Sequence, residues 1–588
     1  MKILLSGNEA VAHGVYRAGC RVAAAYPGTP STEIMFNIGR HFKDRVDCEW
    51  AVNEKTAMEI AIGASIAGRR AFTSMKHVGL NVAMDPLMTH TYIGPLGGLV
   101  IVVADDPNMH SSQNEQDTRN LAKFARAALL EPADSQEAYD MVAAGFDISE
   151  KFGAPVIVRL TTRISHSSTL VELGENFRYG EVEPIPYVKN IAKNLPVPAF
   201  ARPMRVRAEE RTQALRGASS AGVFNRIEPG SDRRFGFVTA SVAYHYVKEV
   251  FPEFGVLKLG FTNPMPIDLV KKFAETVDRL VVVEELDAVM EEQIRATGIA
   301  VVDVRTELRI WELNPMRLAA LRAELLGETA REDTRPPAQD LPTRPPVLCA
   351  GCGHRGVFHI LSKLGATVTG DIGCYTLGAF PPLSAMDTTV CMGACIGNAF
   401  GMRKAGHPGR IAAVLGDSTF FHSGLTGLLD VVYNNGAITT VILDNRTTAM
   451  TGHQDNPGTG KTLMGGPAPI ADIAAICRAL GCRRVHEVDA YDLPGLERAL
   501  TDALDAPEAA VVVAKGPCVL HEKKNLDAIP LAVDNAACKM CGACFKLGCP
   551  AIVRGDGEGK RFKAEITGAC TGCGICKQVC KFNAIKGA

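Results

Sequence analysis

The chain has 588 residues, 47% of them hydrophobic and 22% charged, with a formal net charge of −1. These values are ordinary for a globular protein of several domains, and they exclude an overall basic surface of the kind that binds nucleic acid. No apolar run is as long as a membrane span, and the first residues lack the pattern of a secretory signal, so we expect a cytoplasmic protein. Its 18 cysteines therefore indicate metal binding or catalysis rather than disulfides.

Residues 1–190 alternate short apolar segments with helical patterns. We expect strands at 22–25, 99–104 and 155–160 and a helix over 53–68. Strands separated by helices are typical of βαβ units, which build a parallel sheet. We therefore predict an α/β domain for this part of the chain.

Three polar stretches in this domain are candidates for a binding site. Residues 25–33 (AYPGTPSTE) form a turn after a strand, and Thr29 lies in this turn. Glu54 begins a helix whose buried side is small and apolar, where a carboxyl group can exchange protons, and its competitors are Glu49 and Glu59. The loops at 74–87 and 102–119 follow strands and are rich in Lys, His, Asn and Asp. The alternatives are a plain strand-to-helix turn, a solvated helix cap and hydrated surface loops.

The middle of the chain contains a second α/β segment between two linkers. Residues 191–232 combine prolines with arginines at 202, 205, 207 and 211, and we interpret them as a solvated linker. Residues 233–328 have strand patterns at 235–239, 256–259 and 280–283, and the prolines at 264 and 266 open a helix. Residues 329–346 are charged, rich in proline and poor in apolar residues, as linkers are.

Residues 347–528 contain a pattern suited to a bound divalent cation. An apolar strand at 410–415 leads into Gly416, Asp417 and Ser418, and a second at 438–443 leads into Asn445 and Thr447. Open α/β sheets bind ligands at the carboxyl ends of their strands. A carboxylate, an amide oxygen and a backbone carbonyl suit Mg²⁺, which takes its remaining ligands from phosphates and water. Two ordinary strand-end turns are the alternative.

The same segment carries several cysteines in glycine-rich turns. A single CxxC is ambiguous between zinc, redox and iron–sulfur roles. Glycine-rich turns after strands also suit backbone amides that hold phosphate oxygens. The residues concerned are Cys349, Cys352, Gly353, His354, Gly373, Cys374 and Cys518.

Residues 529–588 form a compact cysteine module. Its two runs, C-x2-C-x2-C-x4-C-P and C-x2-C-x2-C-x3-C, follow the two-cluster ferredoxin pattern, in which the fourth cysteine of each run ligates the other cluster. The first run has one residue more than usual before Cys549, which is expected to perturb the cluster that uses it. Zinc held by four thiolates is the alternative. The predicted ligand sets are Cys538, Cys541, Cys544 and Cys580 for one [4Fe–4S] cluster and Cys570, Cys573, Cys576 and Cys549 for the other.

The motif from Gly416 to Asn445 resembles the diphosphate-and-magnesium motif of thiamine diphosphate enzymes, with Ser418 in place of the usual glycine. The whole chain resembles the 2-oxoacid:ferredoxin oxidoreductases, most closely the large (alpha) subunits of their indolepyruvate branch. The motifs that carry the resemblance are YPGTPSTE, NEKTAMEIAIGASIAG, MKHVGLNVAMDPL, HSSQNEQD, CAGCGHR, LGDSTFFHSG, LDNRTTAMTGHQ and the terminal cysteine module.

The resemblance implies an α/β fold class with several domains. Two thiamine diphosphate-binding domains with parallel sheets would lie at 1–190, for the pyrimidine, and at 347–528, for the diphosphate and Mg²⁺. A transketolase C-terminal-like domain would lie at 233–328 and a two-cluster ferredoxin domain at 529–588.

The resemblance also implies a reaction. A 2-oxoacid, chiefly indolepyruvate or another arylpyruvate, would react with CoA and two oxidised ferredoxins to give an acyl-CoA, CO₂ and two reduced ferredoxins. Glu54 would protonate the aminopyrimidine ring of thiamine diphosphate, and Thr29 matches a position close to the substrate. Asp417, Asn445 and the carbonyl of Thr447 would bind Mg²⁺. The implied partners are ferredoxin and a small beta subunit, in a heterotetramer of two alpha and two beta chains.

A third [4Fe–4S] cluster is a separate hypothesis. Related enzymes hold a cluster beside the cofactor with a CxxC, a cysteine in an Ile-Gly-Cys turn and a distant cysteine. Their counterparts here are Cys349, Cys352, Cys374 and Cys518. Three functional alternatives stay open: a related oxidoreductase that prefers another 2-oxoacid, a thiamine decarboxylase without redox chemistry, and an electron-transfer adaptor.

Overall fold

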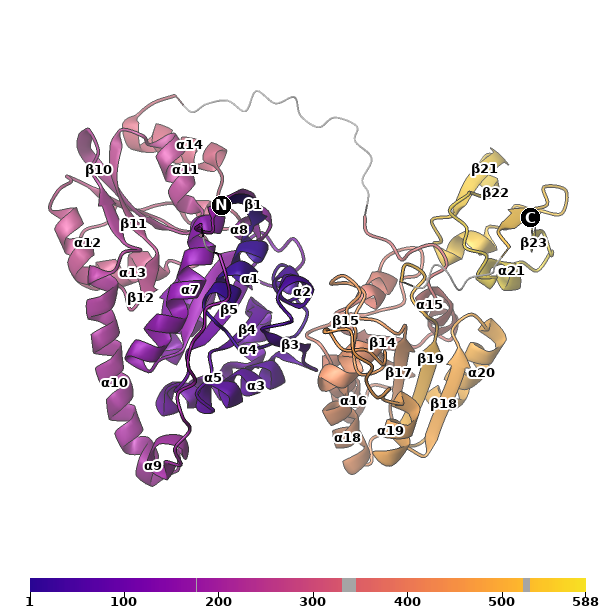
Figure 1. Cartoon of the computed structure of the whole chain (residues 1–588). Coiled ribbons are helices and arrows are strands. Elements are labelled where there is room, and N and C mark those ends of the chain that lie inside the picture. The colour runs from indigo at the N-terminus through magenta and orange to yellow at the C-terminus, as the bar shows by residue number, and fades with distance from the viewer. Residues whose placement is uncertain (176, 330–344, 522–528, 588) are drawn as a thin grey trace. The chain divides into compact units, whose positions relative to one another are not determined.

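The computed structural model describes residues 1–175, 177–329, 345–521 and 529–587. The chain divides into unit 1, residues 1–339, and unit 2, residues 340–588 (Figure 1). The predicted linker at 329–346 lies almost entirely outside the described residues. In the part of the chain that is described, no helix is both long and apolar enough to cross a membrane.

Unit 1 is built on a seven-stranded sheet with the order β12-β6-β7-β5-β4-β2-β3. All neighbouring pairs are parallel except β12 with β6, so the carboxyl ends of six strands meet at one edge. The predicted strands at 22–25, 99–104 and 155–160 are confirmed as β2, β5 and β7. The bounds are β2 Val22–Ala25, β3 Asp47–Trp50, β4 Ala71–Lys76, β5 Leu99–Asp105, β6 Ala128–Leu130, β7 Val156–Thr161 and β12 Phe261–Asn263.

Helices cover this sheet and connect its strands. The predicted helix at 53–68 is confirmed as α3, whose N-cap Asn53 accepts a hydrogen bond from the amide of Thr56. A short antiparallel pair, β1 Lys2–Ser6 and β8 Ser168–Glu172, lies beside them. The helices are α1 Gly7–Arg17, α2 Thr32–His41, α3 Glu54–Ile66, α4 His77–Val82, α5 Met84–Ile93, α6 Thr118–Ala125, α7 Ser135–Phe152 and α8 Thr162–His166.

A smaller sheet in unit 1 has the order β13-β10-β11-β9. The predicted strands at 235–239, 256–259 and 280–283 are confirmed as β10, β11 and β13, and Pro266 is the N-cap of α12. Strand β12 leaves this segment and pairs with β6 of the large sheet, so the two α/β segments share a sheet edge. The bounds are β9 Arg226–Glu228, β10 Asp232–Ala240, β11 Phe254–Leu259, β13 Leu280–Val283, α11 Ala243–Val250, α12 Ile267–Ala274, α13 Val289–Arg295 and α14 Pro315–Leu326.

The prediction of a solvated linker at 191–232 is wrong. Short helix α9 (Ile191–Asn194) and the 24-residue helix α10 (Pro198–Ala221) occupy most of it. Pro198 sits in the first turn, where its missing N–H costs no hydrogen bond, and one face of α10 buries Met204, Ala208 and Leu215. Arg211 is only partly exposed, and its guanidinium donates to the carbonyl oxygens of Thr91 and Gly153.

A buried ionic network joins the two segments of unit 1. Arg119 on α6 donates to Glu284, which follows β13, over 2.7 Å, and Arg159 on β7 donates to Asp105 over 2.6 Å. Both arginines are at most 3% exposed, as a buried charge with several acceptors requires. Glu285 is also buried but accepts a hydrogen bond only from the amide of Leu313 among the described residues, and burial raises its pKa to about 7.

Unit 2 is built on a six-stranded parallel sheet with the order β15-β14-β16-β17-β19-β18. Alternate residues of its central strands enter separate cores on the two faces, as in any sheet covered on both sides. The strands are β14 Thr367–Gly370, β15 Thr388–Thr389, β16 Ile411–Gly416, β17 Thr439–Asp444, β18 Arg484–Asp489 and β19 Ala510–Lys515. The helices are α15 His354–Lys363, α16 Ala394–Lys404, α17 Asp417–Thr419, α18 Leu425–Tyr433, α19 Ile473–Ala479 and α20 Leu493–Leu504.

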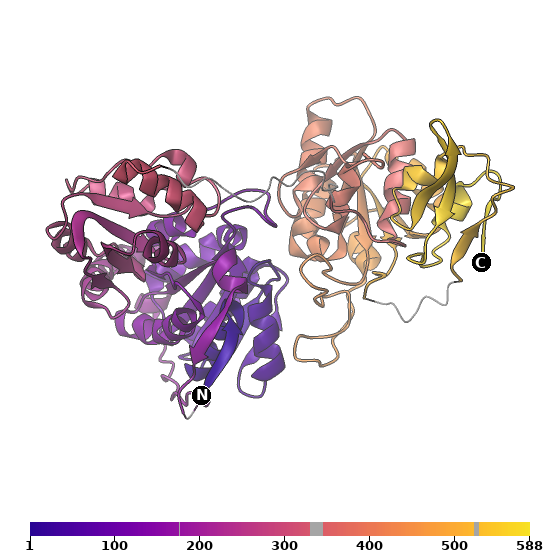
Figure 2. The same cartoon turned by 90° about the horizontal axis from the view of Figure 1, so that it is seen from above.

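The cysteine module packs directly on this sheet domain, as Figure 1 and Figure 2 both show for the yellow segment beside the orange one. Leu547, Ile575 and Ile585 of the module belong to the same hydrophobic core as Leu361 and Leu496. The module therefore shares its hydrophobic core with the sheet domain. Its elements are β20 Leu531–Val533, β21 Ile552–Glu558, β22 Arg561–Ile566, α21 Ile575–Val579 and β23 Ile585–Gly587.

Candidate functional site

The structure brings the predicted magnesium ligands of unit 2 to one edge. Gly416 pairs with Leu443 across β16 and β17, so Asp417 and Asn445 follow adjacent strand ends. The amide of Ser418 donates to Asp417 over 2.8 Å, and the amide of Thr447 donates to the Asn445 side chain over 3.2 Å. Burial, with repulsion from nearby Asp444, raises the pKa of Asp417 to about 7. This buried, hard-oxygen donor set fits Mg²⁺.

Neighbouring side chains hold these turns together. Thr448 donates from its hydroxyl to that of Ser418 over 2.9 Å, which gives the serine at the usual glycine position a structural partner. Asn456, which the sequence analysis missed, donates to Asp417 over 3.3 Å. It lies eleven residues after Asn445 in a loop without periodicity, so only the folded chain reveals it.

The glycine-rich turns lie next to the same edge. Gly373 is the N-cap of a 3-10 turn that begins at Cys374, and Gly353 is the N-cap of α15, which begins at His354. Burial lowers the pKa of His354 to about 4, so its imidazole is neutral. Tyr375 donates a hydrogen bond to Asp371 at the end of β14 and contacts Thr419 over 3.1 Å. These turns thus surround the Asp417 edge with backbone amides and neutral side chains.

The four cysteines of the predicted third cluster gather beside this edge. The amide of Cys518 donates to the carbonyl oxygen of Asn445 over 3.0 Å. Cys374 is close enough to Cys518 and Cys349 for all three thiols to interact electrostatically, and Cys352 interacts with Cys374 and Cys349 in the same way. Burial raises the pKa of Cys352 to about 12 and that of Cys374 to about 11. A bound cationic metal centre would overcome such shifts, because it deprotonates coordinating thiols.

The eight cysteines of the terminal module line two small cavities. The last cysteine of each run lines the cavity of the other run: Cys580 lies with the first three cysteines of the first run, and Cys549 with those of the second. One cavity is lined by Cys538, Cys541, Cys544 and Cys580, and the other by Cys549, Cys570, Cys573 and Cys576. The extra residue before Cys549 is accommodated by a 3-10 turn over Ala543–Leu547 and by Gly548, whose φ is +63°.

The spacing of the thiols distinguishes a cluster from a single ion. Zinc needs its thiolates to converge about 2.3 Å from one point. Within the described residues, no three His, Cys, Asp or Glu side chains converge in that way. The module's cysteines instead stand around a cavity, and this arrangement suits a cluster in which each iron takes a different thiolate.

Arg355 connects the CxxC turn to the cysteine module. It is 3% exposed, it lines the cavity of Cys549, and it donates to the carbonyl oxygen of Leu547 over 2.8 Å. It also donates to the carbonyl oxygens of Leu348 and Cys349. One guanidinium therefore bridges the two groups of cysteines.

The strand ends of unit 1 form a second polar edge. Strands β5, β4, β2 and β3 are neighbours. Ser111 and Thr29 lie in the segments after β5 and β2, Lys76 is the last residue of β4, and Glu54 begins the helix that follows β3. Ser111 donates from its hydroxyl to the carbonyl oxygen of Thr29 over 3.4 Å, and Lys76 donates to the carbonyl oxygen of Ser111 over 2.7 Å. These loops are the ones that the sequence predicts near a binding site, although the sequence indicates no particular role for Lys76.

Glu54 is the buried member of the three candidate glutamates. It is 6% exposed, whereas Glu49 and Glu59 are exposed and Glu59 pairs with Lys55 on the surface of α3. Helix α4 packs against Glu54 at Gly79, where a Cβ would stand only 2.7 Å from Glu54 Cγ. A larger residue at position 79 would therefore collide with the Glu54 side chain unless one of the two moved.

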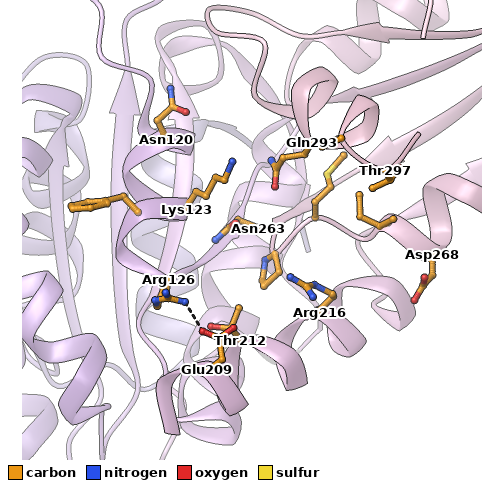
Figure 3. A pocket seen from close by; sticks show the side chains of 15 residues that line it. Asn120, Lys123, Arg126, Glu209, Thr212, Arg216, Asn263, Asp268, Gln293 and Thr297 are labelled. Carbon is orange, nitrogen blue, oxygen red and sulfur yellow. Dashed lines mark hydrogen bonds and ion pairs between the residues drawn. The ribbon is translucent and has the colours of Figure 1, made fainter. Parts of the chain in front are cut away.

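A large cavity of unit 1 lies elsewhere. It has a volume of about 940 Å³ and is lined by side chains of α6, α10, α12 and α13, among them Lys123, Arg126 and Arg216 (Figure 3). Arg126 is paired with Glu209 over 2.9 Å. Asn263 in its wall donates to the carbonyl oxygen of Ala127, just before β6 begins, so this wall of the cavity lies near the amino end of β6. None of the predicted site residues lines it.

Comparison with known proteins decides the family. Residues 13–194 match the family described as "Pyruvate flavodoxin/ferredoxin oxidoreductase, thiamine diP-bdg", residues 371–514 match "Thiamine pyrophosphate enzyme, C-terminal TPP binding domain", and residues 565–586 match "4Fe-4S binding domain". Indolepyruvate oxidoreductase subunit IorA of Pyrococcus abyssi is 42% identical over 629 aligned residues, which cover 100% of this chain and 97% of the relative. The chain belongs to the indolepyruvate oxidoreductase subunit IorA family.

Other members of the IorA family are similar over the same length. Subunit IorA of Methanothermobacter thermautotrophicus is 40% identical and that of Archaeoglobus fulgidus is 38% identical, each over 100% of this chain and at least 97% of the relative. The predicted α/β fold class, with thiamine diphosphate-binding domains and a terminal 4Fe–4S domain, is thereby confirmed. As an IorA-family chain, the protein is an oxidoreductase.

Proposed function

We propose that the chain is the large subunit of an enzyme that oxidatively decarboxylates arylpyruvates, chiefly indolepyruvate. In the balanced reaction, the 2-oxoacid anion, CoA and two oxidised ferredoxins give an aryl-acetyl-CoA, CO₂, a proton and two reduced ferredoxins. The observation that carries the proposal is that one chain holds both the Asp417–Asn445 edge and a module whose eight cysteines line two cavities. A decarboxylase without redox chemistry would not need the cysteine module.

Thiamine diphosphate, when bound, supplies a nucleophilic carbon and accepts the electron pair that CO₂ leaves behind. Asp417, Asn445 and the carbonyl of Thr447 are proposed to hold Mg²⁺ and so to position the diphosphate. Glu54 is proposed to give and take a proton at the aminopyrimidine ring, since its burial excludes water from the carboxyl group. Thr29 is proposed to lie against the substrate.

The domain roles follow from these residues. Residues 1–190 are proposed to bind the pyrimidine, 347–528 the diphosphate and Mg²⁺, and 529–588 two [4Fe–4S] clusters, while 233–328 form a transketolase C-terminal-like domain. Cys349, Cys352, Cys374 and Cys518 are proposed to hold a third cluster. Tyr491 interacts electrostatically with Cys352 and Cys518 of this group and also with Cys573 of the module. The group therefore lies between Asn445 and the module, a position that suits a first electron acceptor.

The proposed partners are a small beta subunit, in an assembly of two alpha and two beta chains, and ferredoxin. We also place the enzyme in the cytoplasm, where thiols stay reduced, because none of its 18 cysteines is in a disulfide.

The test is reduction of ferredoxin or methyl viologen by the chain with its beta subunit under anoxia. Indolepyruvate, phenylpyruvate and pyruvate are supplied in turn with CoA. We expect the arylpyruvates to be oxidised with the highest kcat/KM, and faster turnover of pyruvate would contradict the substrate assignment. Free aldehyde formed without any electron acceptor would instead favour a non-redox decarboxylase. Iron analysis tests the third cluster separately: twelve irons per chain support it, and eight contradict it.

A further inference from the structure

Lys76 is a buried lysine for which the described part of the chain supplies no acidic partner. It is the last residue of β4, its side chain is 8% exposed, and its ammonium donates to the carbonyl oxygen of Ser111 over 2.7 Å. Among the described residues, no carboxylate oxygen lies within the 4.0 Å of an ion pair with it. Burial lowers its pKa to about 8. An ammonium carries three N–H donors, so a single carbonyl acceptor leaves most of its capacity unused.

Asp106 is the carboxylate that has an electrostatic effect on Lys76, but it already accepts hydrogen bonds from other groups. Its oxygens accept the amide of Ser111 over 2.8 Å, the hydroxyl of Ser112 over 2.7 Å and the hydroxyl of Thr162 over 2.9 Å. Asp106 therefore shapes the loop after β5 instead of pairing with Lys76. Burying a cation without such a partner costs free energy, and an anionic ligand would remove that cost.

The neighbouring imidazole adds an unused donor. His77 is 1% exposed, and neither of its ring nitrogens has a hydrogen-bond partner within the part of the chain described. Burial lowers its pKa to about 4, so the ring is neutral and offers one N–H. Two adjacent buried side chains at the carboxyl end of β4 thus have unused donors, and an anion is the ligand that such donors fit.

We propose that Lys76 binds the carboxylate of the 2-oxoacid substrate. The inference rests on the proposed function, because it names the group that recognises that substrate. Lys76 lies next to the proposed substrate residue Thr29 through Ser111, and Gly28 packs on it so closely that a Cβ there would stand 3.2 Å from Lys76 Cβ. The turn before Thr29 therefore leaves room for the lysine side chain beside the proposed substrate residue.

The proposal has a kinetic signature. The ammonium stabilises the intact carboxylate, and this interaction is lost when the carbon–carbon bond breaks, the electron pair stays on the carbon skeleton and neutral CO₂ leaves. An interaction that is stronger in the ground state than in the transition state lowers KM but does not raise kcat. Removing the charge should therefore raise KM strongly without lowering kcat.

The experiment uses the chain with its beta subunit and methyl viologen as the electron acceptor. Lys76→Met and Lys76→Gln remove the charge, Lys76→Arg keeps it, and Lys123→Met removes an exposed lysine on α6 as the matched control. KM for phenylpyruvate is compared with the inhibition constant of its neutral methyl ester. Because the comparison is a ratio, it does not depend on the fraction of active enzyme.

We expect either neutral variant to reduce the preference for acid over ester by about 10- to 100-fold, the loss of one charge-assisted hydrogen bond. Lys76→Arg should retain most of the preference, and Lys123→Met all of it. Neutral variants that keep the wild-type ratio, or that weaken acid and ester equally, would overturn the role of Lys76. Calorimetric titration of phenylpyruvate and of its methyl ester into the same variants gives the ratio even where turnover is lost. A wild-type enzyme that oxidises no arylpyruvate overturns the proposed function instead.

Discussion

Replacing Arg355 by methionine should destabilise unit 2 and release iron selectively. The substitution keeps much of the aliphatic stem but removes the guanidinium that bridges the CxxC turn and the cysteine module. The carbonyl oxygens of Leu348, Cys349 and Leu547 then lose a buried charged donor. Each unsatisfied buried acceptor costs about 1–3 kcal/mol of stability. Part of this loss is offset because the variant no longer has to bury a cation.

We therefore expect a net loss of about 3 kcal/mol, which corresponds to a fall in melting temperature of about 6–12 °C for a unit of this size. Anaerobic urea unfolding followed by circular dichroism measures the free energy, and iron release measures the clusters. Of the two cysteine-lined cavities described for the module, Arg355 lines the one of Cys549, Cys570, Cys573 and Cys576, so that site should lose iron first.

The matched control for this prediction is Arg410→Met. Arg410 pairs with Asp505 at the surface over 2.6 Å, and such exposed pairs contribute about 0–1 kcal/mol. The reasoning is refuted if Arg355→Met shifts the unfolding midpoint no more than Arg410→Met does, or if both module sites lose iron together.

Three further predictions follow from single side chains. Glu54→Gln keeps the shape of the helix start but cannot exchange protons, so turnover should fall by about 10²–10⁴-fold with iron content unchanged, and full activity would exclude Glu54 from proton transfer. Cys374→Ser should lower the iron content by four per chain, whereas unchanged iron would remove Cys374 from any cluster. Protonation of Glu285 stabilises the fold, and this effect is fully present below pH 4.5 and is lost as the pH rises to about 7. The free energy of unfolding of Glu285→Gln should therefore vary less with pH in this range than that of the wild type, by up to about 3 kcal/mol. Parallel stability profiles of Glu285→Gln and the wild type would show that Glu285 does not titrate in this range.

The sequence alone identified those parts of the fold that have a period or a fixed spacing. Strands such as β5 and β16 are continuous apolar runs, and the cysteine spacing is itself a ligand pattern. Helix α10 was missed because its arginines and prolines suggest solvent, while Arg211 finds its acceptors 58 and 120 residues away. Lys76 was missed because its buried state depends on how the loop after β5 folds over it.

The shared core of the cysteine module and the sheet domain has a consequence for how electrons leave the protein. Leu547 and Ile575 of the module pack in one hydrophobic core with Leu496 of the sheet domain. The module is therefore held in a fixed position and does not move as a mobile electron carrier would. Electron transfer inside the protein must then occur over fixed distances, and the external acceptor has to diffuse to the module. Internal transfer, measured after a rapid mix with substrate, should thus be insensitive to solvent viscosity, while reduction of free ferredoxin should slow as viscosity rises.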